Sequence, residues 1–470
     1  MSGASALPDG PLIAFYGDDY TGSSAAMEAL TFAGLPTILF LEPPTPERLA
    51  AARQFRGIGI AGTARAKDPA WMELNLPPAF DVLAGIGAPI AHYKVCSTFD
   101  SAPHIGSIGR AIDLAVPLLG GSWHPLLVGS PAMGRYQMFG HLFATVSGVG
   151  HRLDRHPTMS RHPVTPMDES DLGRHLAKQT ARSIGLIDFV TMANGGADLA
   201  LMRARRAGTE IISLDVLDQA SLIEAGRLIW EYRDKRLFVA GSQGVEQALV
   251  AYWRSAGLIP NSKPDLRLAG VGRIACISGS CSPVTAGQIA HAAENGFEVV
   301  RLDATRAVHA TEWTNEIGRG VVSALAALSS GRDALLITAR GPDDPAIGSL
   351  NAAIETSGAA ATAVNDRIGT GLGQALDSIL ETARLQRTVV AGGDTSGHAL
   401  QAMGIYALNA IAPLAEGAPL CLASSDRTHA SIEIALKGGQ VGEVDLFCRA
   451  RDGGSREQPH ETQSGQARPQ

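Results

Sequence analysis

The sequence has few cysteines, no long apolar run and no excess of basic residues. Its five cysteines form no CxxC pair and are odd in number, so neither a zinc site nor a disulfide framework is expected. No run of about 18 apolar residues occurs, which excludes a membrane-spanning helix of ordinary length. The net charge is −7, so no broad basic face is available for nucleic acid. These absences predict a protein without a membrane or nucleic-acid partner.

Length and composition indicate a globular protein of two domains. The chain has 470 residues, of which 45% are hydrophobic and 18% charged, and this is too long for one ordinary core. Residues 1–11 are small and polar and lack the basic patch and apolar stretch of a secretory signal. Because no disulfide framework is expected either, we predict a reduced, cytoplasmic location. The sequence leaves a homodimer open.

Strands alternate with helices along most of the chain. Segment 12–16 predicts a strand, 17–24 a polar loop and 25–33 a helix, which is the basic unit of α/β proteins. The alternation is interrupted at 256–272, a segment rich in Pro, Asn, Ser, Lys and Gly that is typical of a domain boundary.

The expected fold is therefore α/β with two domains, each a mostly parallel sheet flanked by helices, and with the active site in the cleft between them. We place the domains at residues 1–258 and 259–450. Short strand candidates after Ala418 predict an antiparallel edge. Residues 451–470 are polar and without apolar periodicity, and they are predicted to form a disordered tail.

Two adjacent aspartates follow the first predicted strand. Asp18 and Asp19 lie at the carboxyl end of that strand, where open α/β sheets bind ligands. One of them could accept a proton from a substrate hydroxyl or bind that hydroxyl. Capping the helix that begins at Ala25 would suit Thr21 or Ser23 better, and adjacent carboxylates on a tight turn are not expected to enter the same pocket. We predict a function for at least one of the two.

A second polar group follows the predicted strand 90–95. Lys94 closes this strand, where an ammonium group suits a carboxylate or a transferred phosphoryl group. An ordinary turn with a solvent-directed lysine is the alternative. Cys96 has no histidine or second cysteine beside it and is interpreted as a packing residue. The side chains that could bind a polyhydroxylated ligand are Ser97, Thr98, Asp100 and Ser101.

One segment does not fit the alternation of strands and helices. Residues 151–167 contain three prolines, three histidines and three arginines, so the segment is too polar for a core and too rich in proline for a helix. It is either a long surface loop or a loop that presents cations, Arg161 and His162 among them, to an anionic ligand.

The C-terminal part contains three turns that are rich in glycine and hydroxyl residues, at 278–285, 392–397 and 438–442. Glycine lets the backbone approach an anion, and the N-terminus of a following helix adds partial positive charge. Such turns suit the phosphates or ribose of a nucleotide, although a glycine turn can also serve only to reverse the chain. No GxxxxGK[ST] motif occurs, which excludes a P-loop NTPase as a motif assignment.

Seven ordered motifs together resemble the four-carbon acid sugar kinase family. The resemblance covers nearly the whole chain, and it implies an ATP-dependent kinase of small sugar acids. It places the sugar acid in the N-terminal domain and ATP in the C-terminal domain, and closure of the two domains would exclude water. The motifs are GDDYTG (17–22), TAR (63–65), YKVCSTFDS (93–101), RHPVTPM (161–167), SGSCSPVT (278–285), GGDTSG (392–397) and LKGGQVG (436–442).

The resemblance also implies roles for individual residues. Asp19 and Lys94 would be catalytic. Mg²⁺ would accompany ATP, held mainly by water and phosphate oxygens with Asp394 as a candidate protein ligand, and no dedicated metal site is expected. The implied substrate-binding residues are Asp18, Arg65, Ser97, Thr98, Asp100, Arg161 and His162. The implied nucleotide-binding residues are Ser278, Ser280, Ser282, Gly392, Gly393, Asp394, Thr395 and Gly438.

The motif at 96–100 narrows the expected substrate. Many members of the family carry DSTLR where this chain has CSTFD, and the latter form is similar to the branch that acts on 3-oxo acids. Segment 156–160 suits a variant substrate such as the branched 3-oxo-isoapionate, so 3-oxo-tetronate and 3-oxo-isoapionate both stay open. The alternatives are a threonate or erythronate kinase, a non-catalytic binder of a sugar acid or nucleotide, and an NAD-dependent dehydrogenase. The dehydrogenase is least favoured, because the first strand lacks GxGxxG.

Overall fold

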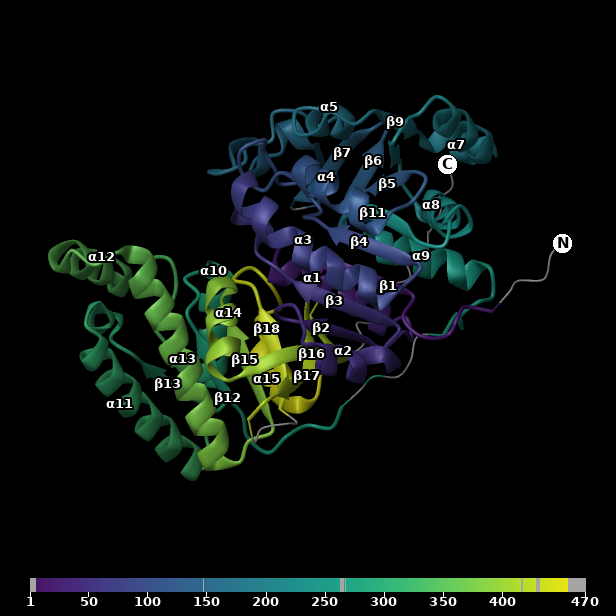
Figure 1. The fold of residues 1–470 in the computed structure, drawn as a ribbon. Coiled ribbons are helices and arrows are strands. Elements are labelled where there is room, and N and C mark those ends of the chain that lie inside the picture. Colours follow the sequence, from purple (N-terminus) through teal and green to yellow (C-terminus); the bar gives the residue numbers. More distant parts are fainter. Residues whose placement is uncertain are drawn as a thin grey trace, which may run out of the picture.

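The chain forms an α/β molecule in which one long sheet passes through both halves (Figure 1). This is a computed structural model, and it describes residues 6–146, 148–262, 266, 268–415, 417–427 and 432–454. Within these residues the strands form one sheet of 15 and a second, antiparallel sheet of three. No helix in these ranges is long and apolar enough to cross a lipid bilayer. The expected α/β class with mostly parallel strands is confirmed.

Parallel strands and their helices make up the N-terminal half. Along the sheet the strand order is β2, β3, β1, β4, β11, β5, β10 and β9, and every neighbouring pair is parallel. The strands are β1 (Ile13–Gly17), β2 (Thr37–Phe40), β3 (Gly57–Ala61), β4 (Ile90–Lys94), β5 (His124–Leu127), β9 (Ile184–Ile187), β10 (Ile211–Leu214) and β11 (Leu237–Gly241). The helices are α1 (Tyr20–Thr31), α2 (Pro46–Ala51), α3 (Pro69–Ile86), α4 (Ile108–Leu119), α5 (Leu172–Leu176), α6 (Phe189–Ala193), α7 (Ala197–Arg206), α8 (Gln219–Glu231) and α9 (Gly244–Ser255).

Successive residues of the central strand β1 pack on opposite faces of the sheet. Tyr16 lies in one core cluster with Phe80 of α3, whereas Ile13 lies in another with Leu249 of α9. Every residue of β1 is therefore buried, and the strand is an uninterrupted apolar run because helices cover both faces. The carboxyl end of the strand is the first place where the chain can position polar side chains.

A small antiparallel sheet was not predicted from the alternation pattern. Its last strand includes residues 151–152, the start of the segment that we expected to be irregular. Met159 and Met167 hold the rest of that segment to the core of the N-terminal half. Gly140 adopts a φ of 77° in the turn between the first two strands, a conformation that favours glycine. The strands are β6 (Arg135–Met138), β7 (His141–Val146) and β8 (Val149–Arg152).

The C-terminal half repeats the parallel arrangement. Its parallel strands follow the order β13, β14, β12, β15 and β18. The strands are β12 (Ala275–Ser278), β13 (Phe297–Arg301), β14 (Asp333–Ile337), β15 (Arg387–Ala391), β16 (Ile405–Ala415), β17 (Ala418–Ser425) and β18 (Glu433–Lys437). The helices are α10 (Pro283–Glu294), α11 (Ala310–Ser329), α12 (Pro345–Ser357), α13 (Ala361–Ala383), α14 (Gly393–Ala402) and α15 (Leu446–Asp452).

Strands β16 and β17 join the two halves into one sheet. β18 pairs antiparallel with β17, β17 with β16, and β16 with β2, so the parallel strands of the two halves run in opposite directions. The expectation that this region forms an antiparallel edge was wrong in its position, because these strands lie in the middle of the sheet. Phe15 and Leu39 of the N-terminal half share a buried core with Ile277 and Leu408 of the C-terminal half.

The last helix extends past the predicted start of the disordered tail. α15 runs to Asp452, and Arg451 Nη1 forms an ion pair with Asp333 Oδ2 at 2.9 Å. The first two residues assigned to the tail are thus helical, because the helix is held by contacts with distant residues that local composition does not reveal. Residues 455–470 lie outside the described part of the chain.

Candidate active site

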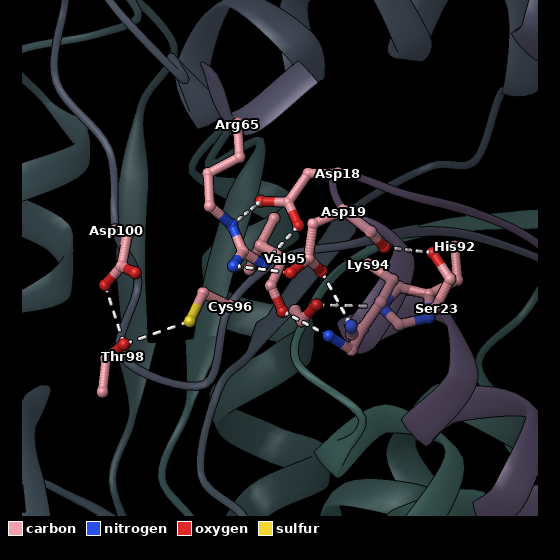
Figure 2. A network of polar contacts seen from close by, with 12 residues as sticks. Asp18, Asp19, Ser23, Arg65, His92, Lys94, Val95, Cys96, Thr98 and Asp100 are labelled. Carbon is pink, nitrogen blue, oxygen red and sulfur yellow. Dashed lines mark hydrogen bonds and ion pairs between the residues drawn. The ribbon is translucent and has the colours of Figure 1, made fainter. Parts of the chain in front are cut away.

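Asp18, Asp19 and Arg65 form a compact ion cluster at the carboxyl end of β1 (Figure 2). Arg65 donates from Nη2 to Asp18 Oδ1 over 2.7 Å and from Nη1 to Asp19 Oδ2 over 2.8 Å. It also donates from Nε to Asp18 Oδ2 over 3.2 Å. The expectation that adjacent carboxylates could not enter one pocket was wrong, because the guanidinium presents separate N–H groups to each of them.

Asp19 also caps α1. Its Oδ1 accepts a hydrogen bond from the Gly22 backbone N–H over 2.8 Å, so the expectation that Thr21 or Ser23 would be the better cap was wrong. The helix therefore starts earlier than predicted and brings its first turn to the site. The side chain of Asp19 is 29% exposed, whereas that of Asp18 is 3% exposed. Asp19 is the carboxylate that a ligand can reach.

Burial and charge act against each other in this cluster. Burial raises the pKa of Asp18, and the neighbouring Arg65 guanidinium opposes that rise. Burial by itself would lower the pKa of Arg65, but the nearby charges, that of Asp18 first, hold this pKa well above its ordinary value. Arg65 thus stays a cation, and the cluster offers a fixed positive charge beside two acidic groups. Such a combination suits an anionic ligand with hydroxyl groups.

Lys94 lies beside the cluster at the end of β4. Its side chain is buried, and Nζ donates to the Val95 carbonyl over 2.8 Å. A Cβ added to Gly22 would lie 2.6 Å from Lys94 Nζ and 2.4 Å from Asp19 Oδ1, so both groups converge on the first turn of α1. Only glycine fits there without displacing them. The alternative of a solvent-directed lysine therefore does not hold.

The turn after Lys94 is held by its own polar contacts. Thr98 Oγ1 donates to Asp100 Oδ1 over 2.7 Å and lies 3.1 Å from Cys96 Sγ (Figure 2). Phe99 is buried with a φ of 57°, and its side chain anchors the turn in the core. Ser97 is half-buried on the same turn. Burial, and then the charge of Asp100, raise the pKa of Cys96 to about 11, so the thiol stays protonated, in keeping with its interpretation as a packing residue.

Arg161 and His162 lie apart from these contacts. Arg161 is exposed, at the end of a short 3₁₀ turn. His162 Nδ1 accepts a hydrogen bond from the Thr165 backbone N–H over 3.1 Å, which holds the loop locally. No hydrogen bond or ion pair among the described residues joins either side chain to Asp18 or Asp19. The structure therefore does not bring these two residues into the cluster.

The three glycine-rich turns of the C-terminal half converge at neighbouring strand ends. Ser278 and Ala391 are register partners in β12 and β15, and Ala391 is in turn the partner of Lys437 in β18. A Cβ added to Gly279 would lie 2.2 Å from Thr395 Oγ1. Gly392 has a φ of 123° and is the N-cap residue of α14, so glycine is required for both the close approach and the turn. Such an arrangement of backbone N–H groups suits phosphate.

Hydroxyl groups connect these turns. Ser282 caps α10 by accepting from the Thr285 N–H over 3.1 Å. Thr285 Oγ1 lies 3.1 Å from Ser280 Oγ and 3.0 Å from the Gly439 carbonyl. Lys437 Nζ donates to Thr285 Oγ1 over 2.7 Å. Thr285 and Lys437 were not predicted individually as binding residues, although a lysine next to two glycines at the end of an apolar strand could have marked the position.

The other predicted nucleotide-binding residues lie on the same turns. Ser278 is buried at the end of β12, and the Ser280 N–H donates to its Oγ over 3.3 Å. Gly393 is exposed and Gly438 follows β18 directly. Asp394 is in the first turn of α14, but its side chain lies outside the described part of the structure.

A cavity of about 910 Å³ lies between the two halves. Tyr20 and Thr63 line it from the N-terminal half, within two residues of the ion cluster in sequence, and Gly279, Gly393 and Thr395 line it from the C-terminal half. This volume is within the usual range for a cofactor site. The apolar wall of this cavity comes from α12 and α13, two helices that no sequence signal marked as part of a site. The apolar residues of this wall are Ile347, Leu350 and Ile368.

Two protein-family models match the two halves of the chain. One, described as a sugar-binding N-terminal domain, matches residues 13–249, and the other, described as a nucleotide-binding C-terminal domain, matches residues 275–447. The chain is also similar to named kinases. It is 49% identical over 454 residues to 3-oxo-isoapionate kinase of Paraburkholderia graminis, and the aligned region covers 96% of each chain.

The chain is also similar to a 3-oxo-tetronate kinase and to solved structures. A 3-oxo-tetronate kinase of Methylobacterium radiotolerans is 31% identical, over 93% of this chain and 97% of that protein. Among solved structures, a Salmonella typhimurium protein superimposes with a TM-score of 0.77 and 26% identity, over 93% of this chain and 98% of that one. A Haemophilus influenzae protein shares the fold. It superimposes with a TM-score of 0.74 and 23% identity, over 93% of this chain and 99% of that one.

Proposed function

Because the chain belongs to the four-carbon acid sugar kinase family and is an ATP-dependent kinase of a sugar acid, we propose that its substrate is 3-oxo-isoapionate. The observation that carries this proposal is the 49% identity to 3-oxo-isoapionate kinase over 96% of both chains. Identity to the 3-oxo-tetronate kinase described above is 31%. We therefore place 3-oxo-tetronate second, and threonate and erythronate after it.

The ion cluster at β1 and β4 suits such an acid. Arg65 and Lys94 supply positive charge for a substrate carboxylate, while the carboxylate and hydroxyl groups of the two turns suit its hydroxyls. Arg65 contacts both aspartates, so an incoming carboxylate must share the guanidinium with them or displace one. Asp19 is the more exposed, and it accepts one hydrogen bond from Arg65 where Asp18 accepts two, so Asp19 is the one that we expect to be displaced. Its displaced oxygen is then free to accept a hydroxyl proton.

Transfer follows from this placement. The acceptor hydroxyl gives its proton to Asp19 as its oxygen bonds to the γ-phosphorus of ATP, and the bond from that phosphorus to the β-phosphate oxygen breaks. Lys94 lies beside the same point and offsets the negative charge that develops there. The C-terminal turns hold the phosphates, and the cavity between the halves, with its wall from α12 and α13, holds the adenosine end.

Mg²⁺ is proposed to bind together with ATP and, when bound, to neutralise phosphate charge. No group of three or more His, Cys, Asp or Glu side chains suited to a metal lies within the described residues. The hydroxyl donors Ser280, Ser282 and Thr395 fit an ion that keeps most of its water and phosphate ligands. Asp394, in the first turn of α14, is the proposed protein contact. A cytoplasmic location and a homodimer are proposed from the sequence alone.

The test is a coupled assay with the full-length protein. The protein receives ATP, Mg²⁺ and one of four acids: 3-oxo-isoapionate, 3-oxo-tetronate, threonate or erythronate. The two oxo acids are made in situ by a dehydrogenase. The release of ADP is then followed. We expect the highest kcat/KM with 3-oxo-isoapionate. Preference for 3-oxo-tetronate would overturn the substrate assignment, and ADP release independent of every acid would favour a nucleotide-binding protein without this kinase activity.

A further inference from the structure

Lys437 is a buried cation without an acidic partner among the side chains that the structure describes. It is the last residue of β18 and is 1% exposed. The only hydrogen bond that its ammonium makes within the described residues is the one to Thr285 Oγ1. Burial lowers the pKa of Lys437 to about 8, because a desolvated ammonium without a counter-charge is unfavourable. Ionisable groups whose pKa is strongly shifted by burial are concentrated at functional sites.

The position of Lys437 connects it to all three glycine-rich turns. Its carbonyl accepts from the Gly392 N–H over 2.9 Å, at the start of the second turn. Its ammonium reaches the first turn through Thr285, whose hydroxyl lies 3.1 Å from Ser280 Oγ. The same hydroxyl lies 3.0 Å from the carbonyl of Gly439 in the third turn. The ammonium is therefore one hydroxyl group away from the surface of the phosphate site.

Lysine sets the direction of this hydrogen-bond chain. An ammonium can only donate, so Thr285 Oγ1 must accept from Lys437 and direct its single proton to Ser280 Oγ or to the Gly439 carbonyl. When Ser280 Oγ accepts that proton, its own proton is free to be donated to another group. Ser280 then presents a donor, the polarity that a phosphate oxygen requires. Ser282 Oγ also lies 3.1 Å from Thr285 Oγ1, but its proton can go to the Gly439 carbonyl instead, so only the ammonium, which cannot accept, excludes the reverse direction.

We propose that Lys437 is the positioning cation of the nucleotide-phosphate site: it orients the Thr285–Ser280 hydroxyls and places a positive charge beneath the turns that bind the terminal phosphates of a nucleoside triphosphate. This proposal rests on the proposed function of the C-terminal half. It also accounts for how a chain without the lysine-containing P-loop motif can supply positive charge to those phosphates.

The test compares nucleotide affinities of the wild type and Lys437→Met by isothermal titration calorimetry, with ATP, ADP and adenosine as ligands. Met keeps the length and apolar stem of Lys and removes its charge. We expect ATP affinity to fall about 10- to 100-fold, the range for a lost hydrogen bond to a charged group. ADP affinity should fall less, and adenosine affinity should stay within about twofold. Thr388→Val is the control, because Thr388 is a buried hydroxyl of the same sheet, bonded to the Ala275 carbonyl at the opposite strand end.

The difference between the affinity losses for ATP and for adenosine decides the outcome. Equal losses for ATP and adenosine would show that Lys437 only maintains the pocket, and unchanged ATP affinity would show that its charge does not reach the phosphates; either result overturns the proposal. If Lys437→Met does not fold, Thr285→Val, which breaks the link to Ser280 and keeps the charge, must give the same selective loss for ATP. A wild type that binds no nucleotide would overturn the proposed function together with this inference, whereas a wild type that binds ATP isolates the role of Lys437.

Discussion

Asp19 makes two contacts that its proposed role must reconcile, the cap of α1 and the ion pair with Arg65. Asn caps helices as well as Asp does, so Asp19→Asn should keep the helix and lose the proton acceptor. We expect kcat to fall at least about 100-fold with a folded protein by circular dichroism. Asp68→Asn is the matched control, since Asp68 caps α3 through the Trp71 N–H at 2.8 Å, and it should keep wild-type kcat. Wild-type turnover in Asp19→Asn would remove this residue from the chemistry.

Lys94 is the second residue with a proposed part in the reaction. Its ammonium is buried and faces the first turn of α1, so Lys94→Ala should remove the charge that balances the transferring phosphoryl group. We expect kcat/KM for the acid to fall at least about 100-fold while the Kd of ATP changes little, because ATP binds in the other half. Lys178→Ala, at an exposed lysine paired with Asp168, is the control. A selective loss of ATP binding in Lys94→Ala would contradict this placement.

Lys437 gives a prediction about stability as well as affinity. Its pKa falls from 10.5 to about 8 on folding, so the buried charge costs stability below pH 8, and this cost disappears as pH rises past 10.5. Removing it should stabilise the ligand-free protein by at most about 3 kcal/mol, less the lost hydrogen bond. Lys437→Met should therefore have a higher Tm than wild type at pH 7, with a smaller difference at pH 9.5. A lower Tm at both pH values would indicate a structural lysine.

At the scale of elements, the turn between β12 and α10 carries an exposed thiol. Cys281 lines the cavity and is exposed, Cys96 is half-buried, and the remaining cysteines are buried. An alkylating reagent should thus label Cys281 first, and ATP should slow this labelling because its phosphates would cover the turn. Mass spectrometry of the labelled peptide measures the rate, and Cys281→Ser, which should lose the fast label, identifies it. Protection by the sugar acid alone, without nucleotide, would contradict the assignment of this turn.

The elements themselves were largely predictable from local sequence. Segment 12–16 was expected as a strand, and β1 spans Ile13–Gly17, because a short apolar run bounded by turns has few other solutions. The start of α1 was predicted too late, since the cap by Asp19 was not recognised. The small sheet β6–β8 was missed because its residues are mostly only partly buried, and apolar and polar residue types do not alternate along its strands.

At the scale of the whole molecule, the shared sheet and core should couple the two halves. β16 pairs with β2 across the halves, and Phe15 and Ile277 belong to one core cluster. We therefore expect a single unfolding transition by differential scanning calorimetry, shifted upward as a whole by ADP. Two separable transitions, with only the later one shifted, would show that the halves fold independently.

The sequence by itself determined the alternation of strands and helices, the polar turns at strand ends and the resemblance to a kinase family, because each is written in residues close together along the chain. Only the tertiary structure decided that Arg65 bridges both aspartates, that the Lys437 ammonium contacts Thr285 and that the halves share one sheet. In that shared sheet, for example, Asn409 of the C-terminal half is the register partner of Ile38 of the N-terminal half. The physical reason is that such contacts join residues far apart in sequence, and local periodicity carries no information about which distant segment will pair with which.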